Sequence, residues 1–225
     1  MDVKVDWNEW YATVTAVQFS FCMFLFAYIQ IQGDRSSQTV KLVRLYIGMQ
    51  CLMWFLVNLS FIQVIGVDKT DWESIESLIR LAFLMIFYYE EAPKAKYLNH
   101  VIILIPLLVF LPLFIAQNAN DFTIIQFFRV LSGGVGLALS FTFLKYLHRE
   151  LSVVSLMDYY LFWFNAGFFL RSGGILWFTM LIALYTPVKA IDSTLLDVSF
   201  SILGLVEYLV LFLGIKKLES KNRYI

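Results

Sequence analysis

Seven long apolar runs follow one another along the 225-residue chain, and only short polar breaks separate them. A helix that crosses a bilayer needs about 20 consecutive, mainly apolar residues. Each run reaches roughly this length, so the sequence predicts seven transmembrane helices. Their approximate ranges are Trp10–Ile31, Lys41–Gly66, Ser74–Ala92, Leu98–Gln117, Ile124–Leu147, Leu156–Tyr185 and Thr194–Ile215.

The composition is that of a lipid-facing chain. Hydrophobic residues make up 60% and charged residues 15% of the sequence, whereas soluble domains carry roughly 45–50% apolar and about 25% charged residues. We therefore expect an all-α, polytopic integral membrane protein that interacts with membrane lipids. The expected organisation is one transmembrane domain over residues 1–225 with no soluble domain.

Several function classes are disfavoured by the residue counts and motifs. The 17 basic and 17 acidic residues leave no net positive charge to attract nucleic acid. Two cysteines and two histidines are too few for a disulfide framework or a zinc site built on several Cys and His ligands. The motifs GxxxxGK[ST], HExxH and GxSxG are absent, and the last predicted helix lacks the lysine that retinal would need. We expect no cofactor, no metal and no catalytic residue.

The basic residues predict the orientation. Of the 17, Arg80, Arg129 and Arg171 lie inside predicted helices. Three lie on one predicted side of the membrane, namely Lys4, Lys69 and Lys189. Eleven lie on the other side: Arg35, Lys41, Arg44, Lys94, Lys96, Lys145, Arg149, Lys216, Lys217, Lys221 and Arg223. Because cytoplasmic loops are enriched in Lys and Arg, this pattern predicts a cytoplasmic C-terminus and an N-terminus outside.

Ionisable residues inside the membrane are the candidate functional residues, because a charge there is costly unless it is paired or hydrated. The sequence places Arg80, Arg129 and Asp197 in the outer half of the membrane and Arg171 and Glu207 near the midplane. Two neutral polar residues, Gln18 and Asn58, lie at comparable or slightly greater depth than the outer group.

Two interpretations of these arginines stay open. Arg171 can form a buried ion pair with Asp197 or Glu207 that joins the sixth predicted helix to the seventh, and Glu76 can pair with Arg80 one turn away. Alternatively, the arginines exceed the acids at their depth and bind a carboxylate, a phosphate or an anionic lipid headgroup, which guanidinium groups recognise well. A proton or ion path is a third interpretation.

Small residues indicate where helices pack closely. Gly133-Gly134 lies in the fifth predicted helix and Gly173-Gly174 in the sixth. Small residues let membrane helices approach each other, so the sequence favours close packing of these two helices. Cys22 and Cys51 fall at similar depth on adjacent helices, where thiols usually serve in packing.

Two segments carry a resemblance to a known group of proteins. In Arg35–Ile62, basic and polar residues lead into an apolar helix containing Trp54. The segment from Tyr159 to Trp177 reads YYLFWFNAGFFLRSGGILW, with Phe162-Trp163, Gly167, Gly174 and Trp177 as its pattern. The chain resembles the seven-helix membrane sensor regions of bacterial histidine kinases and small stand-alone seven-helix bacterial membrane proteins. The resemblance implies signal perception without catalysis, in a bacterial cytoplasmic membrane.

The expected function is therefore that of a receptor-like or accessory sensory subunit. It would perceive an anionic or lipid-like ligand in the outer half of the bundle and signal to a separate, histidine kinase-like partner. The alternatives are a small-solute transporter or channel, a structural subunit of a membrane complex, and a membrane-embedded lipid-modifying enzyme. The residues available to such an enzyme are Tyr88, Tyr89, Glu90, Glu91, His100 and Asp158.

Overall fold

A computed structural model describes residues 7–32, 37–61, 69–91, 124–150, 156–185 and 193–222. These residues form α-helices and one short 3-10 helix, so the prediction of an all-helical chain is confirmed. The predicted helix Leu98–Gln117 lies outside the described residues. The elements are α1 (Trp7–Gln32), α2 (Gln38–Phe61), α3 (Lys69–Glu91), α5 (Ile124–Glu150), the 3-10 helix η1 (Leu156–Asp158), α6 (Tyr160–Tyr185) and α7 (Ser193–Asn222).

Local sequence accounts for several helix ends. The carbonyl of Ser37 accepts the first backbone hydrogen bond of α2, from the amide of Lys41 at 3.2 Å, and serine is a preferred residue before a helix. His148 and Arg149 lie in the last turn of α5, where positive charge complements the helix dipole. The indole of Trp163 donates to the carbonyl of Met157 at 2.7 Å, which fixes η1 against the start of α6.

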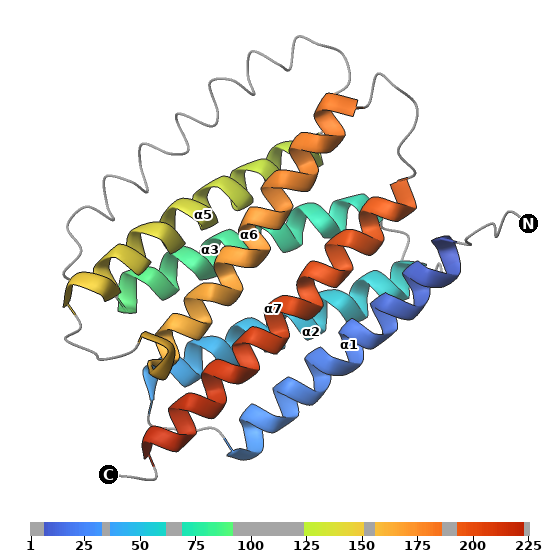
Figure 1. The fold of residues 1–225 in the computed structure, drawn as a ribbon. Coiled ribbons are helices and arrows are strands. Elements are labelled where there is room, and N and C mark those ends of the chain that lie inside the picture. Colours follow the sequence, from blue (N-terminus) through green and yellow to red (C-terminus); the bar gives the residue numbers. More distant parts are fainter. Residues whose placement is uncertain are drawn as a thin grey trace, which may run out of the picture.

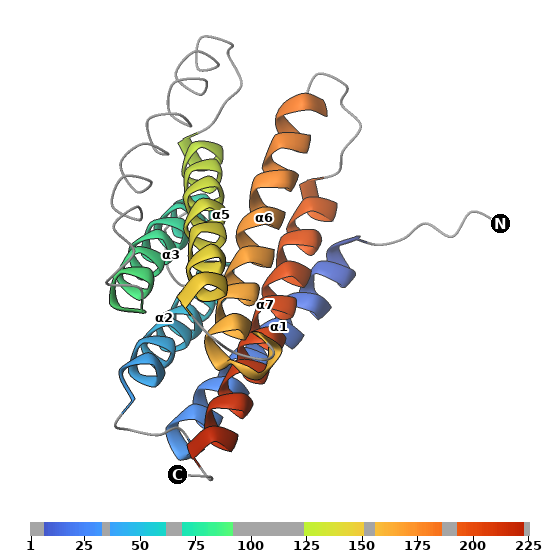
Figure 2. The same cartoon turned by 60° about the vertical axis from the view of Figure 1, so that its left-hand side comes forward.

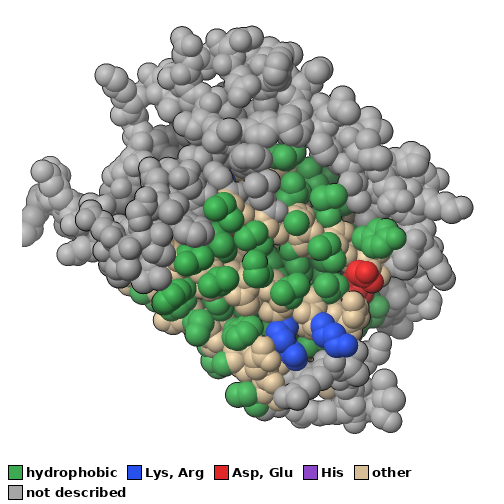
Figure 3. Space-filling view, turned by 180° about the vertical axis from the view of Figure 1, so that it is seen from behind, with side chains coloured by type: hydrophobic (Ala, Val, Ile, Leu, Met, Phe, Trp, Pro, Cys, Tyr) green, Lys and Arg blue, Asp and Glu red, His purple; other side chains and the backbone are tan. Residues whose placement is uncertain are grey.

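Four helices are long and apolar enough to cross a membrane, and they contain the segments Trp10–Ile31, Gln38–Leu56, Arg129–Arg149 and Val198–Glu219. Their outward surfaces are apolar as well: Phe55 of α2 is 51% exposed and Phe141 of α5 is 65% exposed. In Figure 3, hydrophobic side chains are spread over the described surface, and the few charged side chains gather toward one edge. Exposed apolar area of this extent is expected where lipid is the solvent.

The six α-helices of the described part form a closed ring. Each helix packs on the next in the order α1, α2, α3, α5, α6 and α7, and α7 packs on α1. Figures 1 and 2 show that neighbouring helices run in opposite directions except for two pairs, α3 with α5 and α7 with α1, in which both helices run in the same direction. The chain therefore leaves α3 at one end of the bundle and enters α5 at the other end.

The two ends of the bundle differ in charge. At the end where α7 finishes, which we call the basic end, lie Lys41, Arg44, Lys145, Arg149, Lys216, Lys217 and Lys221. At the opposite end, where α1, α3, α5 and α7 begin, Lys69 is the first residue of α3. The helix directions thus gather onto one end the described basic residues that the sequence assigns to the cytoplasmic side.

An aromatic layer fills part of the interior of the ring. Tyr46 of α2 stacks on Phe83 of α3, with ring centroids 4.3 Å apart. Phe168 of α6 meets Tyr46 edge-on at 5.7 Å and Phe87 of α3 at 5.1 Å. Such edge-to-face and offset pairs stabilise aromatic packing beyond the area that they bury. This layer joins α2, α3 and α6 inside the ring.

Candidate functional site

Three charged side chains from three different helices meet inside the ring. They are Arg80 of α3, Arg171 of α6 and Glu207 of α7, and we call them the charged cluster. Their side chains are 1%, 7% and 2% exposed, respectively. Glu207 lies near the middle of the apolar segment Val198–Glu219. The cluster is therefore buried at about mid-height of the bundle.

Glu207 lies between the two guanidinium groups. Its Oε1 is 3.4 Å from Nη2 of Arg80, and its Oε2 is 3.9 Å from Nε of Arg171. Nη2 of Arg171 is also 4.0 Å from Oε1 of Glu76, a partly exposed residue of α3. With Glu76 counted, two positive and two negative charges lie close together, which lowers the cost of burying them.

Neutral groups hold the charged cluster in place. The hydroxyl of Tyr46 donates to Glu207 Oε1 at 2.9 Å, and Nη1 of Arg171 donates to the carbonyl of Phe200. Beside them, the hydroxyl of Tyr208 donates to Gln50 Oε1 at 3.4 Å. Helices α2 and α7 thus fix the position of the carboxylate that both arginines face.

The cluster has more hydrogen-bond donors than acceptors. Each guanidinium carries five N–H groups. Among the described residues, Nε and Nη1 of Arg80 are buried without a hydrogen-bond acceptor, and Nη2 of Arg80 and Nε of Arg171 form no hydrogen bond although they face Glu207 at ion-pair distance. A buried donor without an acceptor costs about 1–3 kcal/mol, and more when it is charged. Additional oxygen acceptors from an anion would satisfy this group.

Gln18 of α1 borders the cluster. It is fully buried, and neither atom of its amide has a hydrogen-bond partner in the described part of the chain. A methyl group at Gly204 of α7 would lie 2.9 Å from the amide carbon of Gln18 and 3.1 Å from Nη1 of Arg171. Gly204 therefore leaves the space in which these two polar groups approach each other.

The other predicted site residues lie apart from the charged cluster or outside the described side chains. Arg129 of α5 places Cζ 4.7 Å from the ring centroid of Phe200, the residue whose carbonyl binds Arg171. Phe200 and Glu207 are separated by about 10 Å along α7 at 1.5 Å per residue. Asn58 belongs to α2 and Asp197 to α7, but their side chains are outside the described set.

Sequence reasoning missed several members of the site. Tyr46, Gln50 and Tyr208 were not expected there. One of the two interpretations paired Arg80 with Glu76 on its own helix, whereas the structure places Arg80 against Glu207. The available signal was a polar residue in an otherwise apolar helix, as with Gln50. The contacts depend on which helices face each other across the ring, and hydropathy does not predict that arrangement.

A second polar group lies nearer the basic end. The hydroxyl of Tyr88 in α3 is 2.7 Å from Oγ of Ser140 in α5, and it donates to Oδ1 of Asn165 in α6 at 2.7 Å. Along α3, Phe83 and Phe87 come between Arg80 and Tyr88. The aromatic layer thus separates this neutral group from the charged cluster.

The residues available to a membrane-embedded lipid-modifying enzyme do not form one group in the described part of the chain. Tyr88 belongs to the neutral group described above. Glu91 accepts a hydrogen bond from Thr39 at 2.5 Å, and Asp158 forms an exposed ion pair with Lys217 at 2.9 Å. Tyr89 and Glu90 lie on the exposed surface of α3, whereas His100 is outside the described residues.

The two cysteines meet between α1 and α2. Their Sγ atoms are 3.0 Å apart in the reduced form, and both side chains are buried. Sγ of Cys22 also lies 3.7 Å from the carbonyl of Ile47. Within the described ranges, no group of three or more His, Cys, Asp or Glu residues is placed to bind a metal ion.

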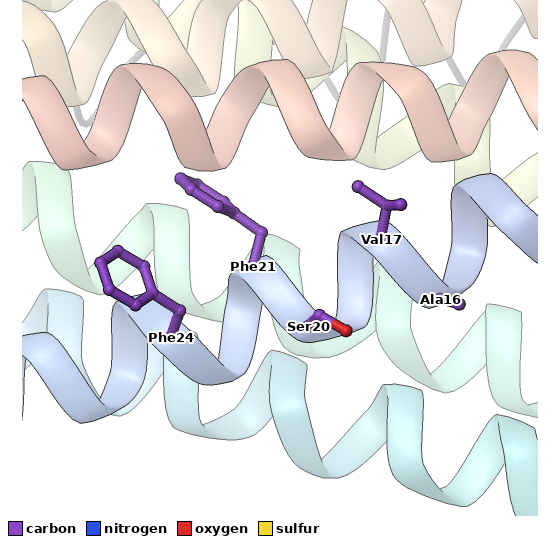
Figure 4. Close-up of a pocket in the computed structure, with 5 residues that line it drawn as sticks. All are labelled: Ala16, Val17, Ser20, Phe21 and Phe24. Atoms are coloured by element: carbon purple, nitrogen blue, oxygen red, sulfur yellow. The ribbon is translucent and has the colours of Figure 1, made fainter.

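A shallow hollow of about 420 Å³ lies along α1. Figure 4 shows its lining residues, and Val17 and Phe21 point from α1 toward α7. The complete lining is Ala16, Val17, Ser20, Phe21 and Phe24. It contains no charged side chain, so it lacks the means to bind an anion.

No protein-family model matches the chain, and neither the curated proteins nor the solved structures contain a significant match to it.

Proposed function

We propose that the chain is a receptor-like sensory subunit of a bacterial cytoplasmic membrane, and that it binds an anionic ligand at the charged cluster. The ligand chemistry is a carboxylate or a phosphate, because these groups accept several hydrogen bonds from guanidinium. The main support for the proposal is the surplus of donors: Nε and Nη1 of the buried Arg80 have no acceptor among the described residues, and Nη2 of Arg80 and Nε of Arg171 reach Glu207 only at ion-pair distance.

The proposed topology has seven membrane-spanning helices, an N-terminus outside and a cytoplasmic C-terminus. Two observations support it. Helices α3 and α5 run in the same direction, so the chain must cross the height of the bundle between them, and the apolar run Leu98–Gln117 falls in that interval. The gathering of Lys and Arg at the basic end supports its assignment to the cytoplasm.

The ligand is proposed to enter from the outer end of the bundle. Glu76 and Arg129, which are only partly buried, lie on that side of the charged cluster. On the other side, Phe83, Phe87 and Phe168 pack into the aromatic layer. An apolar layer of this kind opposes the passage of a charged solute, so it favours binding over transport.

A route for the signal is present in the helices that carry the cluster. Helix α7 continues from Glu207 to Lys217 at the basic end, where Lys217 pairs with Asp158 just before α6. A ligand that favours one packing of α6 against α7 would shift the population of states at this end. The basic end would then act on a separate partner, of the histidine kinase type that the sequence resemblance implies.

The test is anion retention by the purified protein in native mass spectrometry. Wild type, Arg80→Gln and Arg129→Gln are compared with acetate, inorganic phosphate and an anionic phospholipid as probes, and Lys145→Gln serves as an exposed basic control. We expect Arg80→Gln to weaken retention of the preferred anion about tenfold, since a charged hydrogen bond contributes about 1.5–3 kcal/mol. Arg129→Gln is expected to have a smaller effect, and Lys145→Gln none.

Equal retention by all four proteins, with unchanged helix content, would contradict the proposal. In that case the arginines act only as partners in structural ion pairs. Arg129 is only partly buried, so Arg129→Gln is expected to fold even if Arg80→Gln does not.

A further inference from the structure

A groove between α1 and α2 opens on the outside of the bundle, near the basic end. Its volume is about 400 Å³, which is within the range of about 300–1,000 Å³ for sites that bind small molecules. Its lining includes Phe26 from α1 and Lys41, Arg44, Leu45, Gly48 and Met49 from α2. The groove is therefore separate from the charged cluster inside the ring.

The groove is polar at one end and apolar along its length. Lys41 and Arg44 lie in the first two turns of α2, and Leu45, Gly48 and Met49 follow toward the middle of the helix. The distance from Lys41 to Met49 along a helix is about 12 Å at 1.5 Å per residue. One leaflet contributes about 15 Å of hydrocarbon to a bilayer core of about 30 Å. The groove thus spans most of one leaflet, beginning at headgroup level.

Arg44 is fixed in a position from which it can bind a phosphate. Its Nη2 donates to the carbonyl of Ile29 at 3.3 Å, near the end of α1. Its Nε is enclosed by the protein, so it is not the atom that a ligand in the groove would meet. Lys41, one turn earlier on the same helix, is exposed. The pair offers a phosphodiester one oriented guanidinium and one mobile ammonium group.

Gly48 lets the ring of Phe26 pack directly on α2. A methyl group at this position would lie 3.0 Å from Cε2 of Phe26. A larger side chain at residue 48 would push the ring aside and change the floor that Phe26 and Gly48 form together. The shape of the apolar part of the groove therefore depends on the absence of a side chain at this position.

We propose that this groove binds one anionic phospholipid from the leaflet at the basic end. The phosphate lies at Lys41 and Arg44, and one acyl chain lies along Leu45, Gly48 and Met49 against Phe26. Charge complementarity selects an anionic headgroup, and the length of the apolar part matches an acyl chain. This proposal is independent of ligand binding at the charged cluster.

The test is lipid retention in native mass spectrometry of the full chain, released from nanodiscs containing equal amounts of phosphatidylglycerol and phosphatidylcholine. We expect wild type to retain phosphatidylglycerol about tenfold more than phosphatidylcholine. The double variant Lys41→Gln/Arg44→Gln loses this preference, and Gly48→Leu reduces retention of both lipids several-fold. A matched double variant on α5, Lys145→Gln/Arg149→Gln, keeps the wild-type preference, because both residues are exposed and distant from the groove.

Three results would overturn the proposal. One is an equal loss of preference in the α5 double variant, which would mean that total basic charge alone selects the lipid. Another is full lipid retention by Gly48→Leu, and the third is displacement of the lipid by inorganic phosphate. Lys41→Gln alone, at an exposed position, tests the headgroup contact if the double variant fails to fold. Gly48→Leu is expected to leave retention of acetate, a probe of the charged cluster, unchanged, which separates this site from the charged cluster.

Discussion

Replacement of Glu207 by glutamine is expected to destabilise the protein by about 3–5 kcal/mol. Removing one partner of a buried ion pair leaves an uncompensated buried charge, which is the costly change. Glu207 faces both Arg80 and Arg171, so the variant leaves two guanidinium groups without their shared partner. It also replaces the carboxylate that accepts from Tyr46 at 2.9 Å.

The measurement is the free energy of unfolding in detergent, with Glu76→Gln as the matched control. Glu76 is 24% exposed and 4.0 Å from Arg171, so its loss is expected to cost less than about 1 kcal/mol. In a double-mutant cycle, Arg80→Met combined with Glu207→Gln should cost less than the sum of the single changes. A second cycle combines Glu207→Gln with Arg171→Met. If the losses in free energy of unfolding are strictly additive in both cycles, the contacts of Glu207 with the two arginines contribute nothing as pairs.

Replacement of Gly133 by alanine is expected to destabilise the packing of α5 on α6 by about 1–3 kcal/mol, the usual cost of overpacking. The added methyl group would lie 3.0 Å from the amide nitrogen of Leu176 and 3.0 Å from the carbonyl oxygen of Ser172. Both are backbone atoms of α6, so no change of side-chain rotamer can relieve the contact. The two helices would have to move apart.

Gly173 supplies the control for this experiment. A methyl group there would meet Leu137 at 3.4 Å, an ordinary contact with the end of a flexible side chain. Since alanine is favoured over glycine in a helix by about 1 kcal/mol, Gly173→Ala should be neutral or stabilising. Thermal unfolding of the two variants measures the difference. Equal midpoints would contradict the close backbone contact between α5 and α6.

The sequence was sufficient to predict the helices but not their neighbours. Apolar runs identified the six described helices, because the bilayer requires long stretches of apolar residues. The ring order was not predicted, since helix packing depends on shape, and apolar helices are nearly alike in hydropathy. Gly133 and Gly173 were expected at a close interface, yet only the structure shows that Gly133 faces backbone and Gly173 faces a side chain.

The candidate site was predictable to a similar extent. Arg80, Arg171 and Glu207 stood out because charges inside an apolar helix are rare and costly. The hydroxyl of Tyr46 could not be assigned, because a tyrosine in a membrane helix is equally suited to the lipid interface. The depth of Arg80 within the bundle was not predicted correctly. The sequence placed Arg80 in an outer layer with Arg129, whereas the structure places it at the level of Glu207, near mid-height.

Single-cysteine labelling can establish whether the charged cluster lies inside a seven-span bundle whose basic end is cytoplasmic. Cys22 and Cys51 are first replaced by alanine, and a cysteine is then introduced at position 69, 94 or 221. We expect a membrane-impermeant reagent to label position 69 from outside, and positions 94 and 221 only after the cytoplasmic side is opened. Labelling of positions 69 and 94 from the same side would contradict this topology.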